Sequence, residues 1–381
     1  MKRLVFLFCL LFGISAAAQN VHNSARYERI RELRAEADTL GMKQMLDAWG
    51  EKDPEYYAAW SNYCALMADV TTDPSWKGKA VDWVKMGREE FPEDTLLLLK
   101  LPEVLYENGQ YAEALPLAEE VVQKGLDGPL DWYLLNALYS LQGNLDRAAH
   151  YLEKMSQDED EYYRSYAEDA LEQQARLRQR LDSILFVPDH TSIREIAQTA
   201  DFQDLVNRFV ACDTTLTRED IATVYYGSAY GKSYELADAT SESIQNLVKE
   251  GKIQEAIAAL QTRLEEYPVS LSLLVSLYNL SEDESVLSSC LWKVRSLLIV
   301  IDNSGNGFSP ESPHHVICVN DEYQVLQQVY RARALRGQAL LDKLPNGPQD
   351  QMTFVNAYGL DQDTYFYLTP PYWERLPALM P

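Results

Sequence analysis

Positive charge is scarce in this sequence. Its 381 residues include 34 lysines and arginines against 58 aspartates and glutamates, so the formal net charge is −24 at pH 7. A chain this acidic is repelled by phosphate backbones and by anionic lipid surfaces. We therefore expect no nucleic-acid partner, whereas a basic protein partner or a divalent cation would suit the charge.

Long hydrophobic runs are missing beyond the start of the chain. Lys2 and Arg3 precede an apolar run over Leu4–Ser15, and three alanines at 16–18 provide the small residues of a cleavage site. This is the pattern of a secretory signal peptide, because a membrane-spanning helix needs roughly 20 apolar residues. We predict a signal peptide at 1–18 and an exported protein, periplasmic or secreted. The mature chain would carry −24 − 2 = −26 charges and no integral membrane segment.

Cysteine is also sparse. Four cysteines follow residue 18, at Cys64, Cys212, Cys290 and Cys318, and no two of them form a CxxC pair. Their spacings match no metal motif, although an even number in an exported chain permits disulfides. The apolar surroundings of each favour buried thiols. The sequence leaves the disulfide state open.

Catalytic motifs are absent as well. The sequence has no GxSxG, HExxH, P-loop or dinucleotide fingerprint. No Ser/His or Cys/His pairing can be read from its five histidines, and the adjacent His314 and His315 are interpreted as a solvated entry to a strand. No catalytic residue is assigned, and a non-enzymatic role is favoured.

A repeat of fixed period occupies the first half. Gly109 and Gly143 are 34 residues apart, as are Ala114 and Ala148, and the same register places Ala80 in an earlier unit. Each glycine follows large apolar residues at helical spacing and precedes small ones, which predicts two helices that approach closely at alanine. Pro102 would kink or restart the first helix of its unit.

These units resemble the tetratricopeptide repeat, through the period and the Gly-x-Tyr-x-x-Ala core of "GQYAEA". The resemblance implies helical hairpins that form a concave surface for a protein or peptide. We assign residues 19–187 to this domain, with a capping helix over 158–186. Ser61, Tyr106 and Tyr133 are the candidate partner-binding residues on the first helix of each hairpin. The alternative is that these side chains make contacts between domains.

The second half, residues 191–381, is predicted to be an α+β domain. Helical periodicity continues to Ile301, and Thr217 is a predicted N-cap. Three segments rich in β-branched and aromatic residues then predict strands at 316–320, 351–358 and 364–369, in a small antiparallel sheet. The fold class is therefore mainly α, with helical repeats followed by an α+β domain.

Several stretches of this half resemble an uncharacterised family, a domain of unknown function in exported proteins of Bacteroides-type bacteria. They are "TTLTREDIATVYYGSAY", "DNSGNGFSPESPHHVICVNDEYQVL", "GQALL" and "TYFYLTP". The resemblance covers about Thr191 to Glu374. It implies an architecture and a location but no chemistry.

The segment "YYGSAYGKSYE" has an unusual run of tyrosines. If it is helical, Tyr226, Tyr230 and Tyr234 form one ridge, with Gly227 and Gly231 beside it. Such a ridge would suit a peptide or a sugar. The alternative, a packing seam whose hydroxyls bond to the backbone, is favoured.

The stretch "DNSGNG" has the spacing that opens a calcium loop. Asp302, Ser304 and Asn306 occupy ligand positions, and Gly307 follows, but Pro313 stands where a bidentate carboxylate is needed. Any calcium site here would be weak, so we expect no cofactor. The alternative is a tight turn in which Gly305 and Gly307 adopt positive φ.

The sequence thus favours an exported cell-envelope scaffold or binding protein with a protein or peptide partner. It leaves the oligomeric state open. The alternative is a carboxylate-dependent hydrolase or a glycan-processing or glycan-binding protein. Its acids would be Asp302, Glu311, Asp321 and Glu322, although the last two are equally suited to begin a helix.

Overall fold

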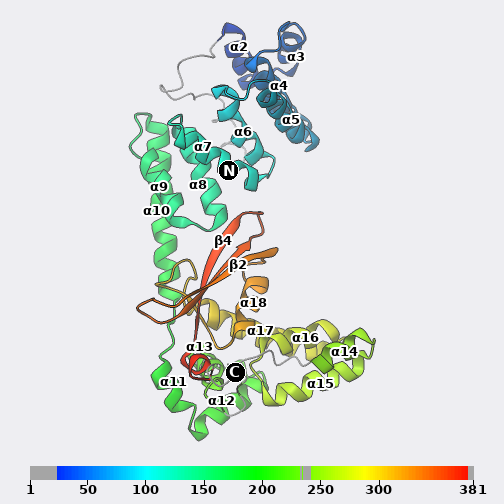
Figure 1. Cartoon of the computed structure of the whole chain (residues 1–381), viewed down its shortest axis with the longest axis vertical. Coiled ribbons are helices and arrows are strands. Elements are labelled where there is room, and N and C mark those ends of the chain that lie inside the picture. The colour runs from blue at the N-terminus through cyan, green and yellow to red at the C-terminus, as the bar shows by residue number, and fades with distance from the viewer. Residues whose placement is uncertain (1–23, 232–233, 235–241, 376–381) are drawn as a thin grey trace. The chain divides into compact units, whose positions relative to one another are not determined.

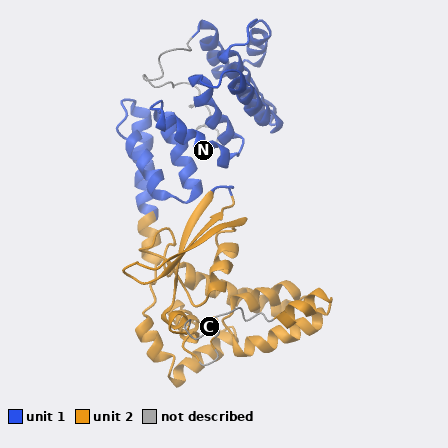
Figure 2. Cartoon of the chain, viewed as in Figure 1, with its two compact units in different colours: residues 1–177, 358–360 blue, residues 178–357, 361–381 orange. Residues whose placement is uncertain are grey.

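The computed structural model describes residues 24–231, 234 and 242–375 (Figure 1). The predicted signal peptide lies outside these residues. The contacts divide the chain into two compact units (Figure 2). Unit 1 comprises residues 1–177 and 358–360, and unit 2 comprises residues 178–357 and 361–381. The division falls within a long helix, α10 (Glu161–Ile184).

Unit 1 consists of successive helices joined by short turns. Their bounds are α2 Ala25–Ala35, α3 Thr39–Asp47, α4 Pro54–Thr71, α5 Ser75–Glu90, α6 Thr95–Glu107, α7 Tyr111–Gln123, α8 Pro129–Gln142 and α9 Leu145–Met155, followed by α10. Helices α4–α5, α6–α7 and α8–α9 pack as three hairpins, and α2–α3 form a further pair before them.

Small residues let the helices of each hairpin approach closely, as the repeat predicts. Ala80, Ala114 and Ala148 are buried on α5, α7 and α9. The turns at Gly109 and Gly143 have φ values of 77° and 85°, a conformation that costs glycine nothing. The sequence register therefore identifies both the contact positions and the turns.

Pro102 does not restart its helix. It lies inside α6, which runs without interruption from Thr95 to Glu107. Proline removes one helical N–H bond, but Pro102 is buried together with Leu98 and Leu101. Apolar burial on this face stabilises the helix despite the missing bond.

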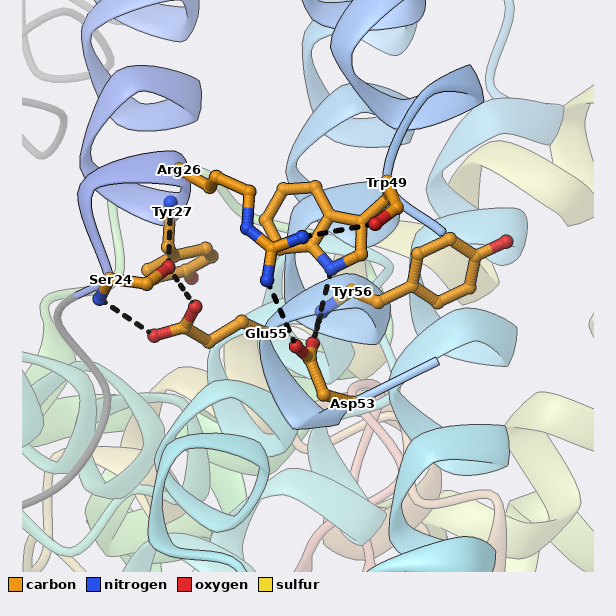
Figure 3. Close-up of polar contacts among 7 residues, drawn as sticks. All are labelled: Ser24, Arg26, Tyr27, Trp49, Asp53, Glu55 and Tyr56. Atoms are coloured by element: carbon orange, nitrogen blue, oxygen red, sulfur yellow. Dashed lines mark hydrogen bonds and ion pairs between the residues drawn. The ribbon is translucent and has the colours of Figure 1, made fainter. Parts of the chain in front are cut away.

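Polar contacts fasten α2 to the start of α4 (Figure 3). Ser24 is the N-cap of α2, and its hydroxyl and backbone N–H both donate to the Glu55 carboxylate. Arg26 donates to the Trp49 carbonyl at 3.0 Å, and the Trp49 indole N–H donates to Asp53 at 3.3 Å. Asp53 in turn caps α4 through Tyr56 N. These contacts fix the first pair of helices against the next hairpin.

Unit 2 contains further helices and one sheet. Their bounds are α11 His190–Ile196, α12 Ala200–Val210, α13 Arg218–Ser228, α14 Glu242–Lys249, α15 Ile253–Glu266, α16 Leu271–Leu280, α17 Glu284–Asp302, β1 His314–Val316, α18 Val319–Gln328, β2 Ala334–Leu341, β3 Gln349–Val355, β4 Asp361–Leu368 and α19 Pro370–Arg375. Thr217 is the N-cap of α13, as predicted. Its hydroxyl accepts from Asp220 N, and the Asp220 carboxylate accepts from Thr217 N. The fold class is confirmed as mainly α with an α+β C-terminal region.

The sheet differs in detail from the prediction. Its order is β1-β4-β3-β2, and β1 pairs with β4 in parallel, so the sheet is mixed rather than antiparallel. Strand β2 had no counterpart among the predicted strands. The reason is that seven of its eight residues are exposed, so it has no apolar alternation.

The described residues contain no helix long and apolar enough to span a membrane. All four described cysteines have free thiols in this structure. Burial raises the pKa of the Cys64 thiol to about 11, which makes it an unreactive core residue.

Candidate functional site

The first helices of the hairpins in unit 1 carry a group of polar side chains. We call this group the helix-A face; it comprises Arg34, Asn62, Lys100, Glu103, Tyr106, Glu107, Asp131 and Tyr133, from α2, α4, α6 and α8. The first three are buried, and the other five are half-buried. Arg34 donates to the Asn62 side chain at 2.7 Å, and Asn62 donates to Tyr27 at 3.2 Å. Lys100 pairs with Glu103 at 2.8 Å.

The carboxyl groups of this face differ in their electrostatics. Burial alone would raise the pKa of Glu103, but Lys100 and Arg34 outweigh it and the pKa is lowered. Burial, together with the charge of Glu103, raises the pKa of Glu107. Burial also raises the pKa of Asp131 to about 7, although the Gly128 N–H opposes the shift. Glu107 and Asp131 therefore stand where a positive charge from a partner would be favourable.

Tyrosines continue the helix-A face toward α10. Tyr106 and Tyr133 are both half-buried, and Tyr133 lies with its ring centre 5.4 Å from that of Tyr166. Burial raises the pKa of Tyr106 to about 12, with Tyr133 and Tyr111 adding to the shift. Half-buried tyrosines offer both an apolar ring and a hydroxyl to a ligand.

Ser61 does not belong to the helix-A face. It is 0% exposed in α4, and its hydroxyl has no hydrogen-bond partner among the described residues. A side chain that is completely covered cannot contact a partner, so this candidate is corrected. The small size of serine instead allows α4 to pack closely against its neighbours.

The three tyrosines of unit 2 do not form a helical ridge. Helix α13 ends at Ser228, so only Tyr226 is helical, and it is 0% exposed. The hydroxyls of Tyr226, Tyr230 and Tyr234 donate to the backbone carbonyls of His315, His190 and Ile317 respectively. The tyrosines thus connect α13 and the segment after it to β1 and to the start of α11. This is the packing arrangement that was favoured for them.

The histidines of β1 are not a solvated entry to the strand. His314 is buried, and its Nε2 lies 2.8 Å from the Tyr330 hydroxyl. His315 pairs with His190, whose Nε2 lies 3.1 Å from His315 Nδ1. This pair joins residues 125 positions apart in sequence, and the sequence contained no signal for it.

The acids at the start of α18 are buried. Asp321 is 2% exposed and accepts from the Tyr225 hydroxyl at 2.6 Å, while Glu322 is 0% exposed. Burial, together with the neighbouring Asp350, raises the pKa of Glu322 well above its usual range. These two carboxyl groups are therefore covered, whereas Asp302 and Glu311, the other two acids of the hydrolase alternative, are exposed.

The predicted calcium ligands take part in local hydrogen bonds. The Ser304 hydroxyl donates to Ile301 O at 2.6 Å and accepts from His315 N at 2.7 Å. Asn306 Oδ1 accepts from Phe308 N at 2.9 Å, and Asp302 ends α17. Among the described residues, no three His, Cys, Asp or Glu side chains are grouped as metal ligands.

Glycine is required in this loop for two different reasons. Gly307 has a φ of 68°, as predicted. Gly305 lacks the predicted positive φ, but a Cβ there would lie 1.9 Å from Pro313 O. Close backbone approach, rather than φ, explains Gly305.

Comparison with known families gives a match in the second half of the chain. Residues 189–368 match a family described as Domain of unknown function (DUF4919). The C-terminal part of this protein is therefore a domain of unknown function, and the match begins at the N-cap of α11. No curated protein matches the chain.

Proposed function

We propose that this protein is an exported cell-envelope binding or scaffold protein that holds a protein or peptide partner on the helix-A face. Its export is inferred from the signal-peptide pattern of residues 1–18. Its hairpins are interpreted as tetratricopeptide-like from their period of 34 residues and the "GQYAEA" core.

One observation carries the proposal of binding: the half-buried tyrosines Tyr106 and Tyr133 stand on the same two helices, α6 and α8, as two carboxyls of raised pKa, Glu107 and Asp131. Tyrosine is enriched where binding energy is concentrated in interfaces. A buried carboxyl is favoured in its charged form when a cation approaches. The face therefore suits an extended segment that carries a basic side chain next to an apolar or aromatic one.

The test is a pull-down from a cell-envelope extract with the full mature chain. We expect a partner that is enriched by the wild-type protein and lost with the double substitution Y106A/Y133A. Tyr278→Ala is the matched control, because Tyr278 is an exposed tyrosine on α16 of unit 2. It should retain the partner.

A second pair of substitutions in the same pull-down tests the acidic side chains of the helix-A face. Glu107→Gln combined with Asp131→Asn removes the two acids while keeping their shape, and should reduce capture by roughly tenfold or more if a basic group binds there. Enrichment that is unchanged by both double variants, or that is lost equally with Tyr278→Ala, would count against the helix-A face.

A further inference from the structure

Strand β2 is an open edge of the sheet in unit 2. The order β1-β4-β3-β2 places it last, and it pairs only with β3, from Ala334 opposite Val355 to Leu341 opposite Gln349. In the part of the chain that the structure describes, the backbone of residues 334–341 makes no hydrogen bond except to β3. Alternate backbone groups of an antiparallel edge strand point outward and are available for another strand.

The features that usually protect such an edge are confined to one position of β2. Natural edges are blocked by charged side chains, proline, or bulges. β2 contains no proline and a single charged residue, Arg336, which occupies a bulge between Leu335 and Gly337. The rest of the strand is open to pairing.

Two exposed leucines, Leu335 and Leu340, lie on β2 beside its unpaired backbone groups. Leu335 pairs with Phe354, and Leu340 pairs with Asp350, so both leucines share the sheet face on which Phe354 and Met352 are buried. Yet Leu335 is 44% exposed and Leu340 is 54% exposed. The core-facing side of the sheet therefore continues onto β2, where the two exposed leucines flank Gln338, whose side chain bonds to Tyr323 and Asp350. An added strand would bury apolar side chains against the leucines.

Charge indicates what kind of strand would fit. Residues 331–343, "RARALRGQALLDK", contain three arginines and one lysine against one aspartate, a local net charge of 4 − 1 = +3 in a chain of −24. Arg336 contacts Asp361 at 3.2 Å, but both side chains are more than half exposed. Such a surface pair is weak and leaves the arginine open to a second carboxylate.

The same charge argues against a second copy of the chain. Pairing β2 with β2 would place two +3 segments together, whereas an acidic segment would meet this local positive charge. We propose that β2 binds an extended, acidic segment of another protein as an added strand. Backbone bonds along residues 334–341 provide affinity, Leu335 and Leu340 receive apolar side chains, and Arg333, Arg336 and Lys343 select carboxylates.

The probe is a fluorescent, strand-length peptide of alternating Glu and Val, tested on the full mature chain. We expect saturable binding by fluorescence anisotropy, and slower amide hydrogen exchange within residues 334–341. Two further versions of the peptide are N-methylated at alternate amides, one at the glutamates and one at the valines. The version whose methyl groups face β2 should not bind, because it lacks the backbone donors toward that strand. R333E/R336E should weaken binding by about tenfold or more. The control K249E/R295E reverses two exposed charges elsewhere in unit 2 and should have no effect.

Several results would overturn this proposal. They are equal binding of a Lys/Val peptide, equal binding of the N-methylated peptides, the absence of saturable binding, or protection outside β2. Protection of residues 334–341 that rises with protein concentration alone would identify a second copy as the occupant. If R333E/R336E does not fold by circular dichroism, Leu340→Asp replaces it, since Leu340 is exposed, and must also weaken binding. This test uses a synthetic peptide and residues of β2. Its result therefore does not depend on whether the helix-A face binds a partner.

Discussion

His190 Nε2 lies 3.1 Å from His315 Nδ1, and the two imidazole rings are nearly parallel, 11° apart, with centres separated by 5.4 Å. One nitrogen of the contact must donate a hydrogen and the other must accept it, so the accepting ring must be neutral and the contact is lost when both rings are protonated. Tyr226 and Tyr367 surround it. The contact joins the start of α11 to β1, 125 positions apart in sequence.

This pair predicts that acid destabilises unit 2. Burial lowers the pKa of His190 to about 4 and that of His315 to about 3. Unfolded histidine titrates near 6.5, so the unfolded state takes up protons first, and stability is lost as pH falls from about 6.5 toward 4. We expect the Tm to fall between about pH 8 and about pH 5.

The double variant H190N/H315N should show a smaller fall, because it removes both titrating rings. His150→Asn, at an exposed position on α9, is the control and should retain the full pH dependence. An identical pH profile for the double variant and the wild-type chain would show that the histidine pair is not responsible.

From Glu322 we expect the opposite trend, a loss of folding stability as the pH rises. Neither of its carboxyl oxygens has a hydrogen-bond partner of normal geometry among the described residues, and its pKa is raised well above its usual value by burial and by Asp350. A raised pKa means that the protonated carboxyl stabilises the folded state. This contribution is fully present below about pH 4.3, the pKa of glutamate in an unfolded chain, and is lost as the pH rises through the folded pKa.

Glu322→Gln cannot ionise, so its stability should decline less with rising pH than that of the wild-type chain. Thermal denaturation across the neutral and alkaline range measures this difference. Glu265→Gln, an exposed substitution on α15, serves as the reference and should follow the wild-type curve. A Glu322→Gln curve parallel to wild type would mean that Glu322 is already ionised when folded.

We expect the stability of unit 2 to depend strongly on a glycine in the loop before β1. Gly305→Ala should lower the free energy of unfolding by roughly 1–3 kcal/mol, because the new Cβ would collide with the Pro313 backbone. Gly337→Ala is the matched change in the same unit, and no atom lies within 4 Å of its Cβ position. Urea denaturation should show little or no loss for Gly337→Ala; equal losses would contradict the steric explanation.

The calcium prediction is also open to direct measurement. Because the Ser304 hydroxyl already bonds to Ile301 and His315, we expect calcium to leave the Tm unchanged. A rise on adding calcium that disappears in Asp302→Ala would instead establish a metal site in this loop.

Local sequence signals predicted the parts of the fold that depend on local packing. Ala80, Ala114 and Ala148 are buried because a period of 34 residues repeats the same helix contact. Thr217 caps α13 because an N-cap needs only its neighbours within one turn. These features can be read from a few adjacent residues.

The remaining features depend on residues far apart in the chain. The contact of His190 with His315 has no local pattern, and the burial of Ser61 depends on which side of α4 its neighbours cover. An exposed strand such as β2 lacks the alternation by which strands are recognised. Of the helix-A face, the sequence identified only Tyr106 and Tyr133. The raised pKa of Asp131 is caused by burial, which the sequence alone does not show.

The most direct test of the proposed function is amide hydrogen exchange on the full mature chain with and without its captured partner. The account predicts that protection is greatest in peptides covering α6, Thr95–Glu107, and α8, Pro129–Gln142. Y106A/Y133A should abolish this protection. Protection confined to α5, α7 and α9, or to unit 2, would contradict the account.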